Sequence, residues 1–167
     1  APSAALSIVE NGPETFAGRK LGVLVASGAD AKTLRSLRTA AKAADVTMAL
    51  VAPTRQGIVD SDGEELEIAE QLDGGPSVLF DAIAIVTTAE SDDDAPLAGM
   101  PAATRFVADA SQHGKFVAHT PGAADLLEAA GIAEPADADG FQQLADTRKS
   151  ASSFLDACAS LRVWARG

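Results

Sequence analysis

Thr120 is the residue whose type and setting come closest to those of a catalytic group. It follows the apolar run 116–118 and precedes Pro121, a pattern typical of a buried strand that turns sharply into a helix. In α/β enzymes such a turn often holds a nucleophile at the carboxyl edge of the sheet, activated by a base and by amide groups at the helix start. The base nearest to Thr120 along the chain is His119.

Capping of the following helix is the simpler role for Thr120, and we favour it. A threonine hydroxyl is a weak nucleophile unless a base lies within hydrogen-bond reach. Neighbouring residues of a strand point to opposite faces, so the imidazole of His119 should not reach the hydroxyl. A β-branched residue is also awkward at positive φ, so we expect a relaxed turn at this position.

Two further candidates have plain structural interpretations. Asp109 and His113 lie four residues apart on one predicted helix face, a spacing that suits a metal or an acid–base pair. Two ligands do not make a metal site, so a surface salt link or a packed histidine is the better interpretation. Cys158 is in line with Phe154 and Leu161, which predicts a buried small hydrophobic residue and not a reactive thiol.

The remaining polar and glycine-rich motifs do not match known ligand sites. The acidic run 92–94 lacks the spaced ligands of a calcium loop, and Gly74 and Gly75 are followed by Pro76, not by the lysine of a phosphate loop. Residues 27–30 lack the three-glycine dinucleotide pattern. We therefore expect no cofactor and no metal. Trp164 either anchors the last helix or contacts another domain, and both readings stay open.

The composition excludes several classes of partner. The formal net charge is −11 and the sequence pI is about 4.4, which disfavours nucleic acid and anionic membrane surfaces. A single cysteine excludes an internal disulfide, and no apolar run approaches the roughly 20 residues of a membrane-spanning helix. We expect a cytoplasmic location. A secreted one stays open, because any signal would precede residue 1 in a longer polypeptide.

The chain alternates between apolar strand patterns and amphipathic helix patterns. Residues 1–17 resemble a linker, and one domain is expected over 18–167. The central strand is predicted at 21–26, with Asp30 capping the next helix, and a small hairpin near Ile58 and Leu66. Other strands are predicted at 46–52, 78–87 and 141–144, and other helices at 102–113, 121–130 and 152–166. This order predicts a three-layer, doubly wound α/β sandwich with a mostly parallel sheet, of the flavodoxin-like type.

Five segments carry a resemblance to a known family: GRKLGVLVASGAD at 18–30, SDG at 61–63, GGPSVLFDAIAIV at 74–86, FVADASQHGKFVA at 106–118 and RVWAR at 162–166. Together they resemble the C-terminal domain of large-subunit (clade 2) haem catalases, over nearly the whole chain. Such domains are similar in fold to the DJ-1/PfpI and class I glutamine amidotransferase superfamily. The resemblance implies that the haem domain, which decomposes hydrogen peroxide to water and oxygen, lies outside this chain.

The resemblance also implies that the catalytic constellation of the superfamily has been lost. Thr120 stands where those enzymes carry a cysteine, Thr33 stands at the position of their carboxylate, and no histidine follows Thr120. The implied role is accessory and non-catalytic, with the catalase haem domain and other catalase subunits as partners. It includes subunit stability, assembly and chaperone-like protection of client proteins, for which the 47% hydrophobic composition leaves an exposed apolar patch open.

The competing hypothesis is an enzyme. It would retain a DJ-1/PfpI-like hydrolase, glyoxalase or amidotransferase activity at Thr120, with Asp30 or His119 as helper. A hydroxyl that is exposed in a pocket and bonded to an imidazole or carboxylate would support this alternative.

Overall fold

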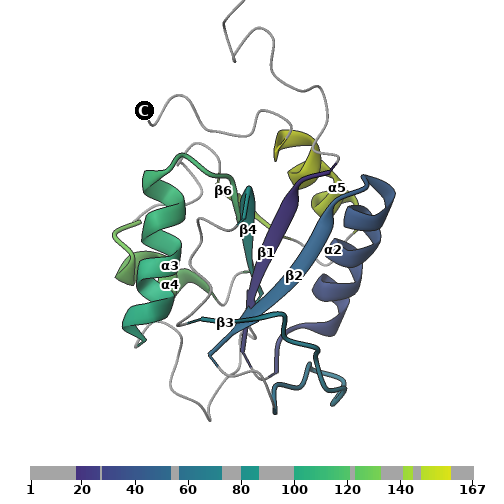
Figure 1. Cartoon of the computed structure of the whole chain (residues 1–167), viewed down its shortest axis with the longest axis horizontal. Helices are drawn as coiled ribbons and strands as arrows, with labels where there is room; N and C mark the ends of the chain where they lie inside the picture. The colour runs from purple at the N-terminus through teal and green to yellow at the C-terminus, as the bar shows by residue number, and fades with distance from the viewer. Residues whose placement is uncertain are drawn as a thin grey trace, which may run out of the picture.

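The computed structural model describes residues 18–26, 28–53, 57–72, 80–86, 100–120, 123–132, 141–144 and 148–158. These ranges form one six-stranded parallel sheet with helices on both faces (Figure 1). The strands are β1 (Lys20–Val25), β2 (Thr47–Ala52), β3 (Glu70–Gln71), β4 (Ala82–Val86), β5 (Val117–His119) and β6 (Phe141–Gln143). The helices are α2 (Ala31–Ala43), α3 (Pro101–Gln112), α4 (Ala124–Ala129) and α5 (Arg148–Ala157).

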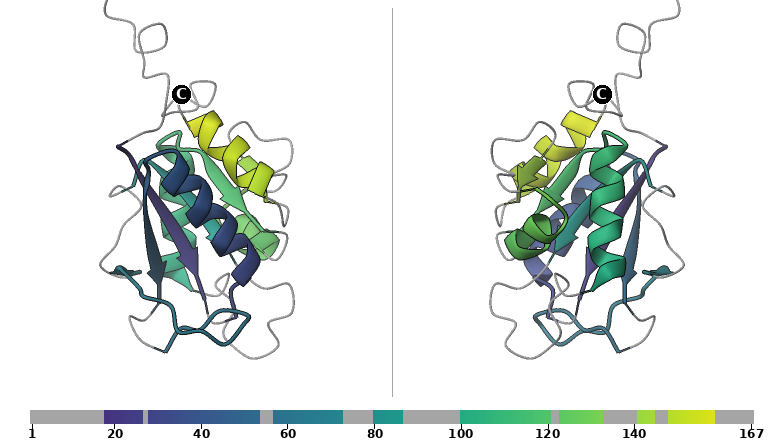
Figure 2. Two further views of the ribbon diagram at one scale, coloured as in Figure 1. Left: turned by 90° about the vertical axis from the view of Figure 1, so that its right-hand side faces the viewer. Right: turned by 90° about the vertical axis from the view of Figure 1, so that its left-hand side faces the viewer.

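The order of the strands explains why the helices divide into two layers. The sheet runs β3-β2-β1-β4-β5-β6, so the chain winds outward from β1 in one direction and then returns to wind outward in the other. Right-handed crossovers therefore place α2 on one face and α3 and α4 on the opposite face. Figure 2 (left) shows α5 beside α2 in front of the sheet and the other two helices behind it. The predicted fold class is confirmed.

Strand β1 shows how the sequence fills both cores. Leu21, Val23 and Val25 are fully buried in the cluster formed with α2 and α5. Leu24 points the other way, into the cluster formed with α3 and α4. Because helices cover both faces, the strand is a continuous apolar run and not an alternating one.

Gly22 lies on the α3 side of β1 for a packing reason. A Cβ at this position would stand 2.5 Å from the ring of Phe80, so no other residue fits without a shift. Phe80 in turn meets Phe106 of α3 edge-on, with ring centroids 6.3 Å apart. The missing side chain thus admits an aromatic pair into the core.

The predicted elements differ from the observed ones mainly at their ends. The hairpin near Ile58 is confirmed by the antiparallel bridge between Val59 and Glu65. The sequence pattern missed β3, because a two-residue edge strand has no apolar period. Helix α5 begins at Arg148, four residues before the predicted start. The predicted start was wrong, since Ser152 is an exposed residue inside the helix.

Several sequence predictions fall outside the described residues. These are the linker 1–17, the glycines at 74 and 75, the acidic run 92–94, Pro121, Leu161 and Trp164. The domain boundary at residue 18 stays a prediction. Among the described residues, the longest helices are too short and too polar to span a bilayer.

Candidate functional site

Thr120 lies at the carboxyl edge of the sheet, directly after β5, and is buried with 5% of its surface exposed. Its amide donates to the carbonyl oxygen of Ile85 on β4 at 3.0 Å, at the last residue pair of β4 and β5. Its hydroxyl Oγ1 donates to the same carbonyl oxygen at 3.4 Å. The hydroxyl therefore turns back onto the backbone of the neighbouring strand.

The backbone at Thr120 is relaxed, as the sequence predicts. Among the described residues, Asp45 is the only non-glycine residue with positive φ, so Thr120 does not adopt the strained turn of a nucleophile elbow. The predicted cap was wrong, since Ala123 and not Thr120 is the N-cap of α4. The amide of Ala123 donates to the carbonyl oxygen of Thr120 at 3.1 Å. This extra turn places the start of α4 at Ala124, later in the chain than predicted.

His119 does not assist the Thr120 hydroxyl. Its Nδ1 lies 3.3 Å from the carbonyl oxygen of Thr120, so in the neutral ring Nδ1 carries the proton and donates it. Its Nε2 is buried and has no hydrogen-bond partner. The imidazole is 5% exposed, and this burial lowers its pKa, an effect that the bond to the Thr120 carbonyl partly opposes. The predicted separation of the two side chains is confirmed.

Asp30 and Thr33 are engaged with each other at the start of α2. Asp30 is the predicted N-cap, and its Oδ1 accepts from the amide of Lys32 at 3.3 Å. Its Oδ2 accepts from the buried Thr33 hydroxyl at 2.6 Å. Both carboxylate oxygens of Asp30 are thus committed to this helix end. The Thr33 hydroxyl thus supports the cap of α2.

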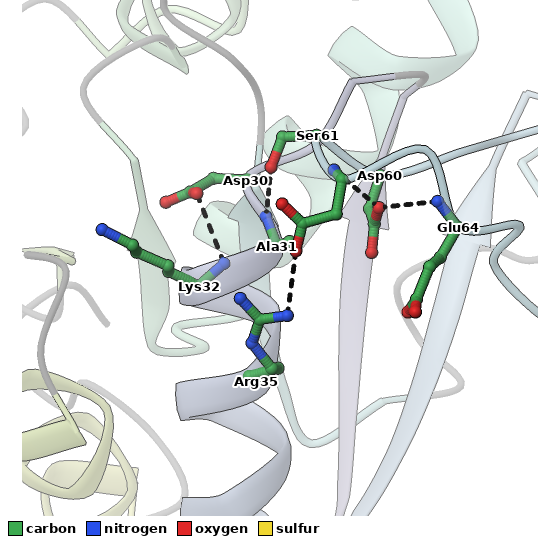
Figure 3. A network of polar contacts seen from close by, with 8 residues as sticks. Asp30, Ala31, Lys32, Arg35, Asp60, Ser61 and Glu64 are labelled. Atoms are coloured by element: carbon green, nitrogen blue, oxygen red, sulfur yellow. Dashed lines mark hydrogen bonds and ion pairs between the residues drawn. The ribbon is translucent and has the colours of Figure 1, made fainter.

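A second segment of the chain closes the same helix end (Figure 3). Ser61 Oγ accepts from the amide of Ala31 at 2.9 Å, and its own amide donates to the carbonyl oxygen of Ala29 at 2.9 Å. Asp60 holds the turn, because its Oδ1 accepts from the amides of Asp62 and Glu64. A helix start that could bind an anion is therefore filled by side chains of the protein itself.

This closure is the feature that sequence reasoning missed. The tripeptide 61–63 contributes to the family resemblance, and Asp and Ser before a glycine are typical of a tight turn. Nothing in a turn signal tells which distant helix it will cap, and Ser61 lies thirty residues from its partner Ala31.

The other candidate residues form no site. Asp109 is half-buried and His113 is exposed, and their side chains share no bond in the described structure, so the predicted salt link is absent. No cluster of three potential metal ligands occurs within the described ranges. Cys158 is fully buried in the cluster beneath α5, as predicted, and burial raises the pKa of its thiol, which keeps it protonated.

Comparison with known proteins gives one family over almost the whole chain. Residues 17–167 match the C-terminal domain found in long catalases. The chain belongs to this family. It is 44% identical to catalase C from Rhizobium meliloti (strain 1021) over 165 residues, which is 99% of this chain and 23% of that protein. It is 32% identical to catalase HPII from Pseudomonas putida, over 99% of this chain and 22% of that enzyme.

The relatives are longer proteins, and the chain matches only a part of each. Catalase HPII from Mycobacterium avium is 29% identical over 98% of this chain and 25% of that protein. The chain thus spans about a quarter of the length of the curated relatives that it matches. Among solved structures, a two-domain protein from Anabaena variabilis, with DJ-1/ThiJ/PfpI-like and ferritin-like domains, aligns with a TM-score of 0.61. That alignment covers 68% of this chain and 34% of the other at 17% identity, so the likeness concerns the fold alone.

Proposed function

We propose that this chain is a non-catalytic accessory domain of a long haem catalase and that it contributes to the stability and assembly of the subunits. The family match over residues 17–167 is the observation that carries the proposal. In the parent polypeptide, peroxide decomposition and the haem belong to the part outside this chain. The partners that follow are the catalase haem domain and other catalase subunits.

The geometry at the carboxyl edge of the sheet supports a non-catalytic role. The Thr120 hydroxyl is buried and donates to the Ile85 carbonyl, and neither ring nitrogen of His119 bonds to it. The Asp30 carboxylate accepts hydrogen bonds from the Lys32 amide and the Thr33 hydroxyl at the start of α2. A threonine needs a base within hydrogen-bond reach to act as a nucleophile, so the hydrolase, glyoxalase or amidotransferase alternative has no observation in its favour.

The experiment compares the full-length parent catalase with a form that ends before residue 18 of this chain. We expect both forms to decompose peroxide at the same rate per haem at 25 °C, and the shortened form to inactivate at a lower temperature and to dissociate at lower denaturant. Equal heat resistance and equal subunit assembly would contradict the proposed role. Peroxide turnover at catalase-like speed by the 167-residue chain alone, with or without added haem, would contradict its non-catalytic nature.

Chaperone-like protection of client proteins is a secondary part of the proposal. A client-binding surface needs exposed apolar side chains. Within the described ranges, every leucine, isoleucine, valine, phenylalanine and methionine is buried or half-buried. The described surface therefore favours stability and assembly over client binding. Protection of a heat-aggregating client by the purified chain would support the chaperone role, and aggregation at molar excess would oppose it.

A further inference from the structure

The outer face of α2 is cationic in a strongly acidic protein. The helix carries four lysine and arginine residues and no aspartate or glutamate, whereas the whole chain has a net charge of −11. All four side chains are exposed: Lys32, Arg35, Arg38 and Lys42. They recur at helical spacing, so they form one stripe, here called the cationic face. In the described structure, Arg38 and Lys42 have no ion-pair partner.

An acidic surface lies directly beside the cationic face. The described segment 57–72 contains no lysine or arginine, and its exposed carboxylates are Asp62, Glu64, Glu65 and Glu67, here called the acidic segment. Figure 2 (left) shows this part of the chain passing below the first turn of α2. The Ser61–Ala31 hydrogen bond and the Arg35–Asp62 ion pair at 3.0 Å fix it there.

The Arg35–Asp62 pair marks the border between the two surfaces. Its side chains are 60% and 52% exposed, so it is a solvent-screened contact that contributes little stability to the fold. Beyond it, the cations continue along α2 through Arg38 and Lys42, and the next acidic residues of the other segment, Glu64 and Glu65, are exposed. The cationic face and the acidic segment thus adjoin at the Arg35–Asp62 pair.

We propose that the adjoining cationic face and acidic segment form an interface between two copies of the chain, related by a two-fold axis that runs along the Arg35–Asp62 border. Adjacent halves of opposite charge complement themselves under a two-fold rotation, because the cationic face of each copy then meets the acidic segment of the other. This inference rests on the assembly role proposed above and names the surface that performs it.

The overall charge does not oppose such a contact at physiological salt. Two copies with a charge of −11 repel each other at long range. At about 0.15 M salt the Debye length is about 8 Å, so long-range repulsion is screened while charges in contact still interact. An anionic membrane or a nucleic acid would meet the full acidic charge of the rest of the surface. A carboxylate-rich copy of the same chain brings its own complementary cations.

The first test measures the oligomeric state of the 167-residue chain by sedimentation velocity over a concentration series. We expect dimers at about 0.15 M salt and dissociation at about 1 M salt, where the Debye length falls to about 3 Å. A chain that stays monomeric throughout the series at the lower salt would overturn the proposal.

The second test reverses each half in turn. Arg38→Glu with Lys42→Glu reverses two of the four cations of the cationic face, and Glu64→Lys with Glu65→Lys reverses two of the four exposed carboxylates of the acidic segment. Each variant alone should dimerise at least about tenfold more weakly, since the altered half loses its net charge and like charges meet at the reversed positions. An equimolar mixture of the two should form heterodimers. The lysine variant is decisive, because it makes the net charge of the chain less negative. If association depended only on overall repulsion between copies, this variant would associate more strongly, whereas the proposed interface predicts weaker association.

The matched control is Arg105→Glu on α3, an exposed charge reversal on the opposite helical layer. It should dimerise like the unmodified chain. Dimers that survive either reversal, or a mixture that stays monomeric, would refute this interface. The test is separate from that of the accessory role, which is measured on the haem enzyme with and without this domain. Failure here would leave that role standing with a different contact surface.

Discussion

His119 is the described residue whose surroundings fit its side chain least well. Its Nδ1 donates to the Thr120 carbonyl, but Nε2 is buried without a partner. Protonation would place a charge at this unpaired nitrogen, so burial lowers the pKa of His119 in the folded state. Below the ordinary value of 6.5 the unfolded chain then binds more protons than the folded one. Stability is therefore lost as the pH falls through 6.5 toward the lower folded pKa.

The prediction compares His119→Gln with His113→Gln, since these two residues are the only histidines of the chain. Urea unfolding of each variant at several pH values between 7.5 and 5 separates this effect from that of the carboxylates, which all forms share. Between pH 7.5 and pH 5 the chain with His119 should lose more stability than the His119→Gln variant. His113→Gln is the control for the loss of an imidazole at an exposed position. Parallel slopes for all three forms would rule out a buried neutral imidazole at position 119.

Single residues also show how far the candidate site could be predicted. Alternation along a strand is a local rule, and it correctly separates His119 from the Thr120 hydroxyl. The identity of the N-cap at Asp30 is equally local. The start of α4 was misplaced because its extra turn depends on a backbone bond between Thr120 and Ala123, which no residue type announces.

At the scale of elements, the junction between α2 and the hairpin should contribute measurably to the free energy of unfolding. Ser61 accepts from the first helical amide, Ala31, while Asp30 accepts from the next one. Ser61→Ala should destabilise the chain by about 0.5–2 kcal/mol, as loss of a capping hydroxyl does. Hydrogen exchange should quicken first at the Ala31 amide.

The control for this prediction is Ser152→Ala, which changes an exposed serine inside α5. It should leave the free energy of unfolding within about 0.5 kcal/mol, as surface substitutions do. Equal stability of the Ser61 variant, with unchanged exchange at Ala31, would mean that water replaces the hydroxyl and that the hairpin does not secure the helix.

The elements themselves could be predicted wherever burial imposes a period. β1 and β4 are covered by helices on both faces, and their uninterrupted apolar runs identify them as interior strands. β3 could not be predicted, because its two residues at the sheet edge pair only with Val51 and Ala52 and bury little. The placement of Ser61 against α2 depends on the pairing of β1 with β2, because α2 follows β1 and Ser61 follows β2. That pairing is a property of the assembled sheet.

At the scale of the whole molecule, charge is distributed unevenly about a neutral core. The described apolar residues form two clusters on either side of the sheet, while the surface carries most of a net charge of −11. Such self-repulsion destabilises the compact state more than the unfolded chain, in which the charges lie farther apart. The exposed Arg35–Asp62 pair acts in the opposite sense, but a surface pair contributes at most about 1 kcal/mol.

The chain should therefore become more stable as salt is added from a low starting concentration. Raising the ionic strength from about 0.01 M to about 0.15 M shortens the Debye length from about 30 Å to about 8 Å. We expect a gain of about 1 kcal/mol, or about 2–4 °C in Tm, in thermal unfolding of dilute protein. Choline chloride should act like sodium chloride if screening is the cause. A Tm that falls with salt would show that attractive local pairs such as Arg35–Asp62 outweigh the net repulsion of the acidic surface.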